Sequence, residues 1–313
     1  MNQFFQNVWK GLNASPKYLE SKYFYDATGD KIFEEIMECP EYYLTSCEKE
    51  IFQLQTAALT DKFLSSLKDF DLVELGAGSA MKTSFLLKHM VQREIDFTYY
   101  PIDISAHVIA GLSKTLPLKI PGLKVHGLNG DYFDMLDELK QISGRNKVVL
   151  FLGSSIGNIT LEETESFCKQ LRSHLLPGDM GLIGFDLKKD ARIVLPAYND
   201  KAGITKRFNL NLLQRINKEL DADFDTTAFE HSPMYDEVTG ACKSYLVSSK
   251  KQSVRIGEVG RIQFDKDEPV YMEISQKYTV SQTDTFAKNS AFKPVHHFFD
   301  TKKWFLDTLW QAV

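Results

Sequence analysis

The stretch DLVELGAGSAMKTSFLL, which runs from Asp71 to Leu87, decides the fold. Its apolar start predicts a strand over Asp71–Gly76, and the glycines Gly76 and Gly78 predict a tight turn after that strand. The apolar spacing over Met81–Arg93 then indicates an amphipathic helix. A glycine turn between a strand and a helix can cradle a pyrophosphate, an adenosine group or no ligand, so the rest of the chain must distinguish these cases.

Strand-like and helix-like segments alternate from Asp71 to Leu187. Further strands are predicted over 97–104, 123–131, 146–158 and 179–187, and helices over 106–116 and 160–175. Because each helix joins two strands, we expect right-handed crossovers and a mostly parallel sheet. The fold class is therefore α/β.

The alternation ends after Leu187. A long helix is predicted over Arg207–Phe224, followed by antiparallel strands over 243–256 and 270–279 that the polar segment GEVGRIQFDKDEP joins. A helix over Val280–Ala291 and a final hairpin-like stretch would complete the first sheet. We therefore expect two domains: residues 61–195 plus 281–313 form the sheet domain, and residues 1–60 plus 196–280 form a second, smaller α+β domain.

Composition and charge exclude several classes of protein. The net charge of -5 and the scattered lysines and arginines argue against a nucleic-acid partner. Four cysteines, at positions 39, 47, 168 and 242, lie too far apart for a zinc-type pair, so we expect idle thiols and no metal. The N-terminus lacks the apolar core of a signal peptide, and no window of about 18 apolar residues would span a membrane. We expect a monomer in the cytoplasm with no membrane partner.

The residues after the turn narrow the choice of its ligand. A dinucleotide-binding turn has a third glycine, and here Met81 takes that place. Asp103 closes the second strand, and Asp131, in NGDYF, closes the third. Carboxylates at successive strand ends point into the crevice where open α/β sheets bind ligands, and they can accept hydrogen bonds from a ribose diol or an amine. Either aspartate could instead cap a helix. As a set, these residues fit S-adenosylmethionine, which carries no phosphate.

Five longer stretches carry a family resemblance. The chain resembles, over nearly its whole length, the histidine Nα-methyltransferases of ergothioneine biosynthesis, which are histidine-specific and depend on S-adenosylmethionine. The matching stretches are KYFYDATGDKIFEEIMECPEYYLTSCEKEI, VELGAGSAMKT, FLGSSIGN, DLKKDARIVLPAYNDKAGITKRFNLNLLQRINKELDADFD and MEISQKY. The resemblance implies a Rossmann-like class I methyltransferase sheet, S-adenosylmethionine as the cofactor, and a substrate-binding role for the second domain.

The resemblance also assigns residues to the site. The cofactor-binding residues are Gly76, Gly78, Lys82, Asp103, Asp131 and Tyr132. The substrate-binding residues are Tyr42, Gly153, Asn158, Tyr198, Glu273 and Ser275, and the catalytic residues are Tyr25 and Asn158. In this assignment Asn158 and Tyr198 hold the carboxylate of the amino acid, Tyr25 lies near its amine, and Tyr42 lies near its side chain. Without the resemblance, each tyrosine would be interpreted as packing and Asn158 as a turn residue.

Glu273 and Ser275 bear on the choice of substrate. They lie two apart on a predicted strand and therefore share a face, where a carboxylate and a hydroxyl can satisfy both nitrogens of an imidazole. The implied reaction is methylation of the α-amino group of free L-histidine to the trimethylated betaine. Ser244, in CKSYLV, stands where a larger apolar residue is expected, so another aromatic amino acid such as tryptophan is an alternative substrate. A non-catalytic protein that binds S-adenosylmethionine is the alternative from another class.

Overall fold

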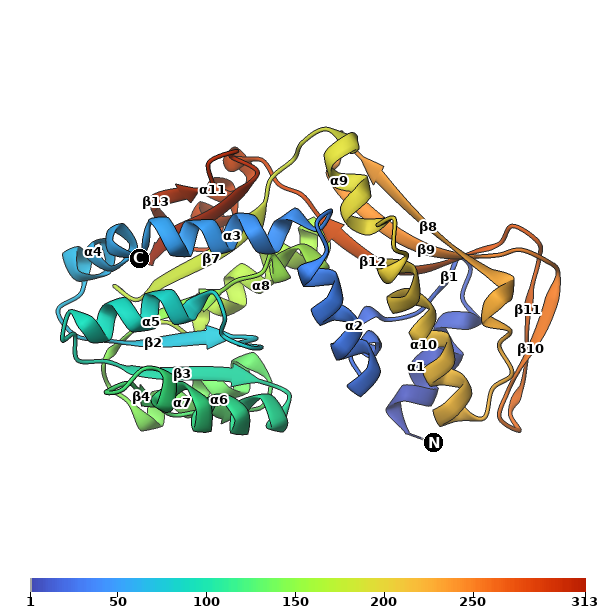
Figure 1. The fold of residues 1–313 in the computed structure, drawn as a ribbon, viewed down its shortest axis with the longest axis horizontal. Helices are drawn as coiled ribbons and strands as arrows, with labels where there is room; N and C mark the ends of the chain where they lie inside the picture. The colour runs from blue at the N-terminus through green and yellow to red at the C-terminus, as the bar shows by residue number, and fades with distance from the viewer. Residues whose placement is uncertain (1) are drawn as a thin grey trace. The chain divides into compact units, whose positions relative to one another are not determined.

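The computed structural model describes residues 2–313, and the chain divides into two units that each contain a sheet (Figure 1). Residues 44–188 and 277–313 form the eight-stranded unit. The residues up to Tyr43, together with 189–276, form the four-stranded unit. These bounds differ from the expected ones chiefly at residues 44–60, which belong to the eight-stranded unit.

The larger sheet is mostly parallel. Its strands are β2 (Phe70–Leu75), β3 (Thr98–Asp103), β4 (Lys124–Val125), β5 (Leu128–Asn129), β6 (Asn146–Phe151), β7 (Met180–Asp186), β13 (Phe292–Phe299) and β14 (Phe305–Ala312). They lie in the order β13-β14-β7-β6-β2-β3-β4, with β5 also paired to β3. Only β14 runs opposite to the other strands, pairing antiparallel with β7 on one side and with β13 on the other, so the C-terminal hairpin completes the sheet as predicted. The expected α/β class and the mostly parallel, Rossmann-like sheet are confirmed.

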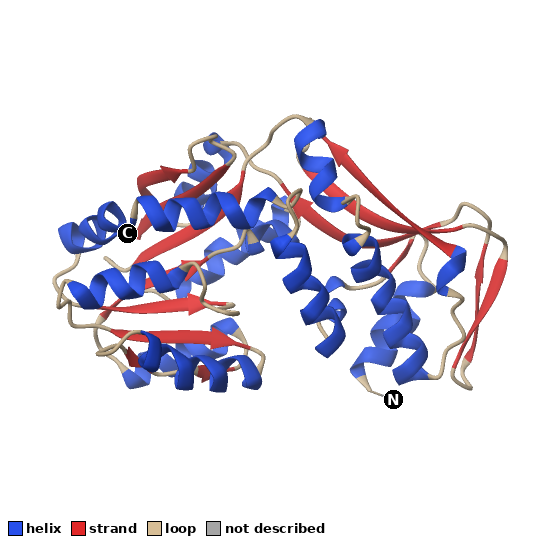
Figure 2. Ribbon diagram, in the orientation of Figure 1, coloured by secondary structure: helices blue, strands red, loops and turns tan. Residues whose placement is uncertain are grey.

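Helices cover both faces of this sheet (Figure 2). They are α3 (Tyr43–Leu54), α4 (Thr56–Ser66), α5 (Thr83–Gln92), α6 (Ala106–Lys119), α7 (Tyr132–Ile142), α8 (Leu161–Ser173) and α11 (Val280–Asn289), with a short 3-10 helix, η2 (Ser155–Asn158). Strand alternation separates the faces. Ile183 and Phe185 of β7 join a core cluster with residues of α7, α8 and α11, whereas Gly184 between them lies against Glu48 of α3. The helix α3 therefore packs on the face opposite α7, α8 and α11.

One predicted strand of this unit is wrong as a continuous element. The segment 123–131 forms two short strands, β4 and β5, separated by His126 and Gly127. The His126 N–H still donates to the Tyr99 carbonyl at 2.9 Å, but the backbone at Gly127 passes close to α6, where an added Cβ would lie 2.8 Å from the Ser113 hydroxyl. The segment 146–158 is likewise shorter as a strand, because its GSSIGN end forms a turn and η2.

The four-stranded unit combines a mixed sheet with a hairpin. Its strands are β1 (Lys17–Tyr18), β8 (Phe229–Asp236), β9 (Ala241–Ser248), β10 (Gln252–Ile256), β11 (Gly260–Phe264) and β12 (Pro269–Gln276), and its helices are α1 (Gln3–Leu12), η1 (Ser21–Phe24), α2 (Ala27–Glu38), α9 (Ala191–Tyr198), α10 (Ile204–Leu220) and η3 (Thr226–Ala228). The sheet order is β1-β12-β9-β8. The antiparallel pairing of β9 with β12 is confirmed. The single strand predicted over 243–256 is wrong, because this segment forms β9 and β10, which belong to different sheets.

The polar connector of this unit is not a plain loop as predicted. It contains β11, which pairs antiparallel with β10. Ile262 and Phe264 of β11 are buried in one core cluster with Val254 and Ile256 of β10. The alternation of these apolar residues with polar ones is the period of a half-buried strand, and the charged residues around it obscured that pattern.

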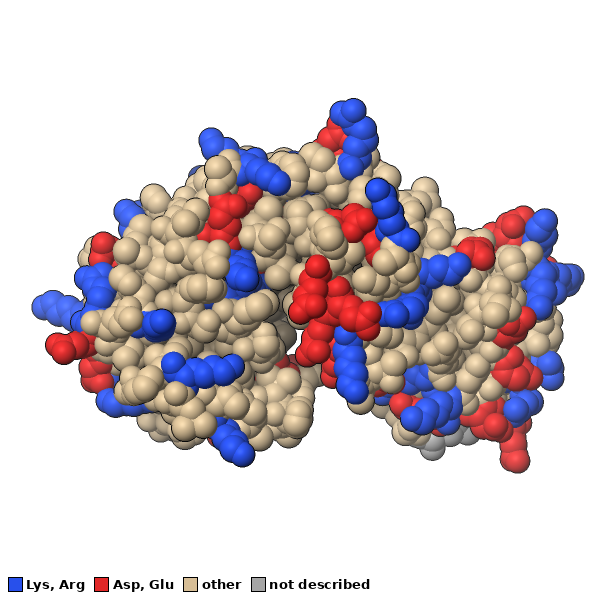
Figure 3. All heavy atoms as spheres, in the orientation of Figure 1, with Lys and Arg blue, Asp and Glu red and all other residues tan. Residues whose placement is uncertain are grey.

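Three further features of the chain are the cysteines, the apolar character of the helices, and the charged side chains on the surface. Within residues 2–313, none of the four cysteines is in a disulfide, and none of the helices has the length and apolar character that a membrane span needs. The face that Figure 3 shows carries both basic and acidic side chains, and acidic ones gather in one patch near the middle of the view.

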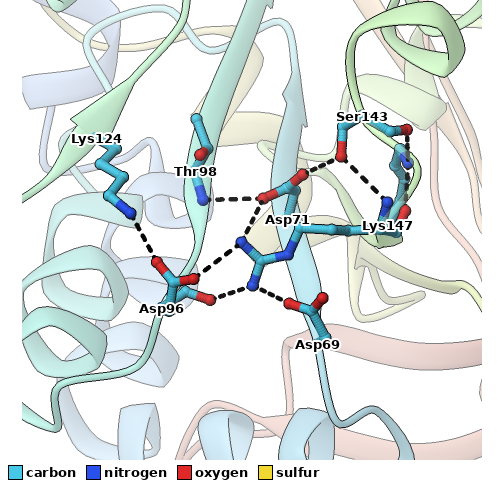
Figure 4. A network of polar contacts seen from close by, with 8 residues as sticks. Asp69, Asp71, Asp96, Thr98, Lys124, Ser143 and Lys147 are labelled. Atoms are coloured by element: carbon cyan, nitrogen blue, oxygen red, sulfur yellow. Dashed lines mark hydrogen bonds and ion pairs between the residues drawn. The ribbon is translucent and has the colours of Figure 1, made fainter.

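A charge network ties together the amino-terminal edge of the larger sheet (Figure 4). Asp71, at the start of β2, is buried and accepts from the Thr98 N–H at 3.0 Å and the Ser143 hydroxyl at 2.6 Å. The Arg145 guanidinium contacts Asp71 and Asp96 at 3.5 Å. Lys124, which begins β4, pairs with Asp96 at 2.7 Å. The amino ends of three parallel strands are thereby joined through side chains.

Candidate active site

The glycine turn lies at the carboxyl end of β2. All six residues of β2 are buried, and the chain then turns through Gly76 at φ +71° and Gly78 at φ +49°, a left-handed region that favours glycine. A Cβ at Gly76 would lie 2.8 Å from the Tyr132 hydroxyl, whereas a Cβ at Gly78 would meet open space. The turn therefore exposes backbone, and the phenol of Tyr132 lies directly over it.

Asp103 and Asp131 flank this turn. The Asp103 carboxylate, at the end of β3, accepts from the Gly78 N–H at 3.2 Å and from the Ser105 N–H at 2.9 Å. Asp131 is exposed and caps α7, accepting from the Phe133 N–H at 3.0 Å. Burial, together with the charges of Asp103 and Asp131, raises the pKa of Tyr132 to about 12. Tyr132 is therefore a hydrogen-bond donor beside two carboxylates at neutral pH.

The donors and acceptors of this edge fit S-adenosylmethionine. Its ribose diol and adenine amine need acceptors, and the two aspartates can accept; its single carboxylate needs a donor, and Lys82 can donate. Backbone N–H groups hold Asp103, and each carboxylate oxygen keeps a lone pair after one hydrogen bond. Within residues 2–313, no cluster of metal-ligating side chains is found. The predicted cofactor residues thus lie at one edge of the sheet, although Asp131 also has the capping role considered as its alternative.

Lys82 and Gly153 share a partner that the sequence analysis missed. Glu48 of α3 is fully buried, forms an ion pair with the Lys82 ammonium, and accepts from the Gly153 N–H at 2.8 and 3.0 Å. The Gly153 N–H is therefore already used within the protein. The signal for Glu48 was its place on the apolar stripe of α3, between Leu44 and Ile51, where a charged residue needs a buried partner.

Asn158 closes the turn after β6 and is exposed. Its amide makes no hydrogen bond within the part of the chain that the structure describes, 2–313. The turn itself is fixed, because the buried hydroxyl of Tyr278 donates to the Ile156 carbonyl at 2.8 Å and bonds to Thr164 at 2.9 Å. Asn158 thus combines a rigid backbone with an amide available as donor and acceptor.

The four-stranded unit brings together the other predicted residues. The Tyr198 hydroxyl, at the end of α9, bonds to the Ser275 hydroxyl of β12 at 2.7 Å, and both residues are buried. The ring of Tyr42 lies 6.2 Å from that of Tyr198, edge to face. Tyr25 is 43% exposed and packs against Phe33, which is 6.5 Å from the Tyr42 ring. Tyr25, Tyr42, Tyr198 and Ser275 therefore belong to one continuous set of contacts.

Glu273 lies two residues before Ser275 on β12, and polar side chains from α10 and β9 lie beside it. The side chain amide of Asn209, from α10, donates to Glu273 at 3.5 Å and to the Thr205 carbonyl at 3.1 Å. Asn209 is fully buried, and its own carbonyl oxygen has no partner within residues 2–313. Ser244 of β9 stands directly opposite Glu273 and is 1% exposed. Since opposite residues share a face, Ser244 is the immediate neighbour of Glu273.

Asn209 is the second residue that the sequence analysis missed. It falls among Phe208, Leu212 and Leu213, which form the buried stripe of α10. An amide on such a stripe must find partners or lose solvation, so it signals a buried polar site. The sequence predicted the helix, but it did not show that Asn209 on this helix lies against Glu273 of β12.

The sheet order, the glycine turn and the carboxylates at the strand ends define an S-adenosylmethionine-dependent methyltransferase. The chain matches the family described as "Histidine-specific methyltransferase, SAM-dependent" over residues 4–312, and it belongs to that family.

Three relatives illustrate the range of this similarity. The chain is 35% identical to a histidine N-alpha-methyltransferase of Mycobacterium tuberculosis, over 87% of this chain and 84% of the relative. It is 33% identical to a histidine N-alpha-methyltransferase of Mycolicibacterium smegmatis, over 94% and 90%. It is 28% identical to an L-tryptophan methyltransferase of Psilocybe serbica, over 94% and 89%.

Proposed function

We propose that this protein methylates the α-amino group of free L-histidine and carries the amine to the trimethylated betaine, a step of ergothioneine biosynthesis. The observation that carries the proposal is the set of Glu273, Ser275 and Asn209, which places a carboxylate, a hydroxyl and an amide together in the four-stranded unit. An imidazole offers one N–H donor and one acceptor nitrogen, and this set can satisfy both. The two relatives above 30% identity that are named for histidine support it.

The two units have separate tasks in this proposal. The eight-stranded unit binds the cofactor through Gly76, Gly78, Lys82, Asp103, Asp131 and Tyr132. The four-stranded unit binds the amino acid through Tyr25, Tyr42, Tyr198, Glu273 and Ser275. Asn158 and Gly153, which the family resemblance assigns to the substrate, belong to the eight-stranded unit, where the Gly153 N–H donates to Glu48.

S-adenosylmethionine supplies a methyl group on a sulfonium, which is already a good leaving group. The protein therefore acts by positioning a neutral amine and by excluding water. Asn158 suits this task because its amide accepts from an amine and donates to a carboxylate, and Tyr198 adds a phenol donor. Tyr25 is the residue that we assign to the amine, where its hydroxyl can accept a hydrogen bond.

Tryptophan is the second candidate substrate. Ser244 leaves more room opposite Glu273 than a large apolar residue would, and one relative is named for L-tryptophan. An indole, however, offers a single N–H donor, so it would leave part of the polar set without a partner. A buried polar group without a partner lowers affinity, and this favours histidine.

The test is mass spectrometry of an incubation that contains the purified protein, S-adenosylmethionine and equal amounts of histidine, tryptophan and tyrosine. We expect histidine to be consumed first and to gain three methyl groups. Glu273→Ala should lower turnover of histidine by roughly tenfold or more, which is the scale of one charge-assisted hydrogen bond. Equal or faster turnover of tryptophan by the unmodified protein would refute the histidine assignment, and no transfer to any amino acid would refute the enzyme.

A further inference from the structure

A charged cluster lies on the α3 face of the larger sheet, behind the cofactor edge. Its members are Glu48 of α3, Lys82 directly before α5, and Asp307 of β14. The Glu48 side chain has no exposed surface, and that of Lys82 is 20% exposed. Asp307, the third residue of β14, is fully buried. Of the three, only Lys82 reaches solvent.

The two carboxyl groups of this cluster share the space above Gly184. A Cβ at Gly184 would lie 3.0 Å from the Asp307 Oδ1 and would overlap the Glu48 Oε1. Asp307 and Gly184 are paired across β14 and β7, so only a glycine admits both acids at this position. Glu48 is further fixed by the Gly153 N–H, which donates to both of its oxygens.

Two carboxyl groups face one ammonium, so they cannot both be balanced as ions. No donor from residues 2–313 reaches either oxygen of Asp307. Burial, reinforced by the charge of Glu48, raises the pKa of Asp307 well above its usual range, and the Lys82 charge only partly opposes this. A neutral Asp307 can donate its proton to Glu48, which leaves Glu48 as the one charged acid.

Lys82 connects this cluster to the cofactor edge. It lies four residues after Gly78, directly before α5, and its ammonium passes 3.5 Å from the Cβ position of Gly153. The only anionic group of S-adenosylmethionine is the carboxylate of its methionine part. The Lys82 ammonium therefore has one anionic partner in the cofactor. The direction in which this ammonium points depends on Glu48, its ion-pair partner within the protein.

We propose that Glu48 is a positioning residue that directs the Lys82 ammonium toward the cofactor carboxylate, while Asp307 acts as a neutral acid that donates to Glu48. This inference rests on the proposed binding of S-adenosylmethionine. Glu48→Gln removes the charge and gives Lys82 and the Gly153 N–H only one carbonyl oxygen to share. Lys82 then loses its fixed direction.

The test compares two probes in calorimetric binding experiments: S-adenosylhomocysteine, which has the carboxylate, and 5′-methylthioadenosine, which lacks the amino-acid part. Glu48→Gln should weaken S-adenosylhomocysteine by roughly tenfold, the scale of a charge-assisted hydrogen bond, and leave 5′-methylthioadenosine unchanged. Lys82→Met should give the same selective loss, and the double variant should be no worse than Lys82→Met alone. The double variant also removes both charges together, so it remains informative if Glu48→Gln alone does not fold.

A second measurement addresses Asp307. The infrared difference between the unmodified protein and Asp307→Asn at neutral pH should show the carbonyl band of a protonated carboxylic acid. A carboxylate band in its place, or equal weakening of both probes by Glu48→Gln, would overturn the proposal. If the unmodified protein binds neither probe, the proposed function fails instead, and the two failures are thereby distinguished.

Discussion

At the amino-terminal edge of the larger sheet, Asp71 is buried and both of its oxygens accept hydrogen bonds from neighbouring segments, with Arg145 beside it. At the carboxyl edge, Asp103 is held by two backbone N–H groups, and the Asn158 amide has no partner within residues 2–313. One edge uses its polar groups to join strands, and the other keeps them available. In a parallel sheet the same strands therefore supply stability at one end and a binding site at the other.

The largest effect is expected at Asn158. Under the proposed function, Asn158→Ala removes hydrogen bonds to the amino-acid head group, which every substrate of this class carries. We expect kcat/KM to fall by roughly tenfold to a hundredfold for each accepted amino acid, because each lost charge-assisted bond costs about 1.5–3 kcal/mol. Steady-state kinetics with two amino acids checks this. A loss confined to one substrate would show that Asn158 contacts the side chain.

Asp103→Ala should have the next largest effect. It removes an acceptor for the ribose, so the Kd of S-adenosylmethionine should rise by roughly tenfold. Thermal stability should change little, because the lost partners are backbone N–H groups near solvent. Calorimetry measures the affinity, and an unchanged Kd would exclude this placement of the cofactor.

Asp71→Asn, at the amino-terminal edge, is the counterpart of Asp103→Ala. It should change the stability of the fold and leave the affinity for the cofactor unchanged. It should reduce the free energy of unfolding by about 1–3 kcal/mol, since the Thr98 N–H and the Arg145 guanidinium lose a charged partner. The Kd of S-adenosylmethionine should stay the same. A weaker cofactor affinity together with unchanged stability would break the comparison between the two edges.

An effect that depends on pH is expected at Glu74, the fifth of the six residues of β2. Burial raises the pKa of Glu74 to about 7, although it accepts from Thr83 at 2.7 Å and from Tyr99. The folded protein therefore keeps a proton that the unfolded chain releases above its ordinary pKa of 4.5. Stability should fall as the pH rises from 4.5 to about 7, by at most about 1.4 kcal/mol per pH unit, and level off above that range.

Glu74→Gln isolates this contribution, because glutamine keeps the shape and does not titrate. Unfolding by urea at several pH values should show a shallower decline in the variant than in the unmodified protein. Identical slopes in the two proteins would mean that Glu74 is ionised throughout.

The sequence could predict the features that depend on local pattern. Gly76, Gly78, Asp103 and Asp131 follow apolar runs, and parallel strands necessarily bring their carboxyl ends together. The residues missed, Glu48 and Asn209, are polar groups on apolar helix stripes. Their roles depend on Lys82, Gly153 and Glu273, which lie far away in the sequence, so only the tertiary structure could pair them.

The boundaries that failed have a similar cause. The strand over 123–131 looked continuous because its composition is suitable throughout, but Gly127 must pass close to Ser113 of α6. The strand β11 was hidden because charged residues surround Ile262 and Phe264, whose partners Val254 and Ile256 lie across the hairpin. In both places a neighbouring element, and not the local sequence, determines where the strand ends.

A crystal structure of the protein with S-adenosylhomocysteine and L-histidine tests the central claim most directly. We expect the ribose hydroxyls on Asp103, the cofactor carboxylate on Lys82, and the imidazole nitrogens on Glu273 and Ser275, with the Asp71 network unchanged. A cofactor bound away from the turn at Gly76 and Gly78, or a histidine whose ring contacts neither Glu273 nor Ser275, would contradict the account.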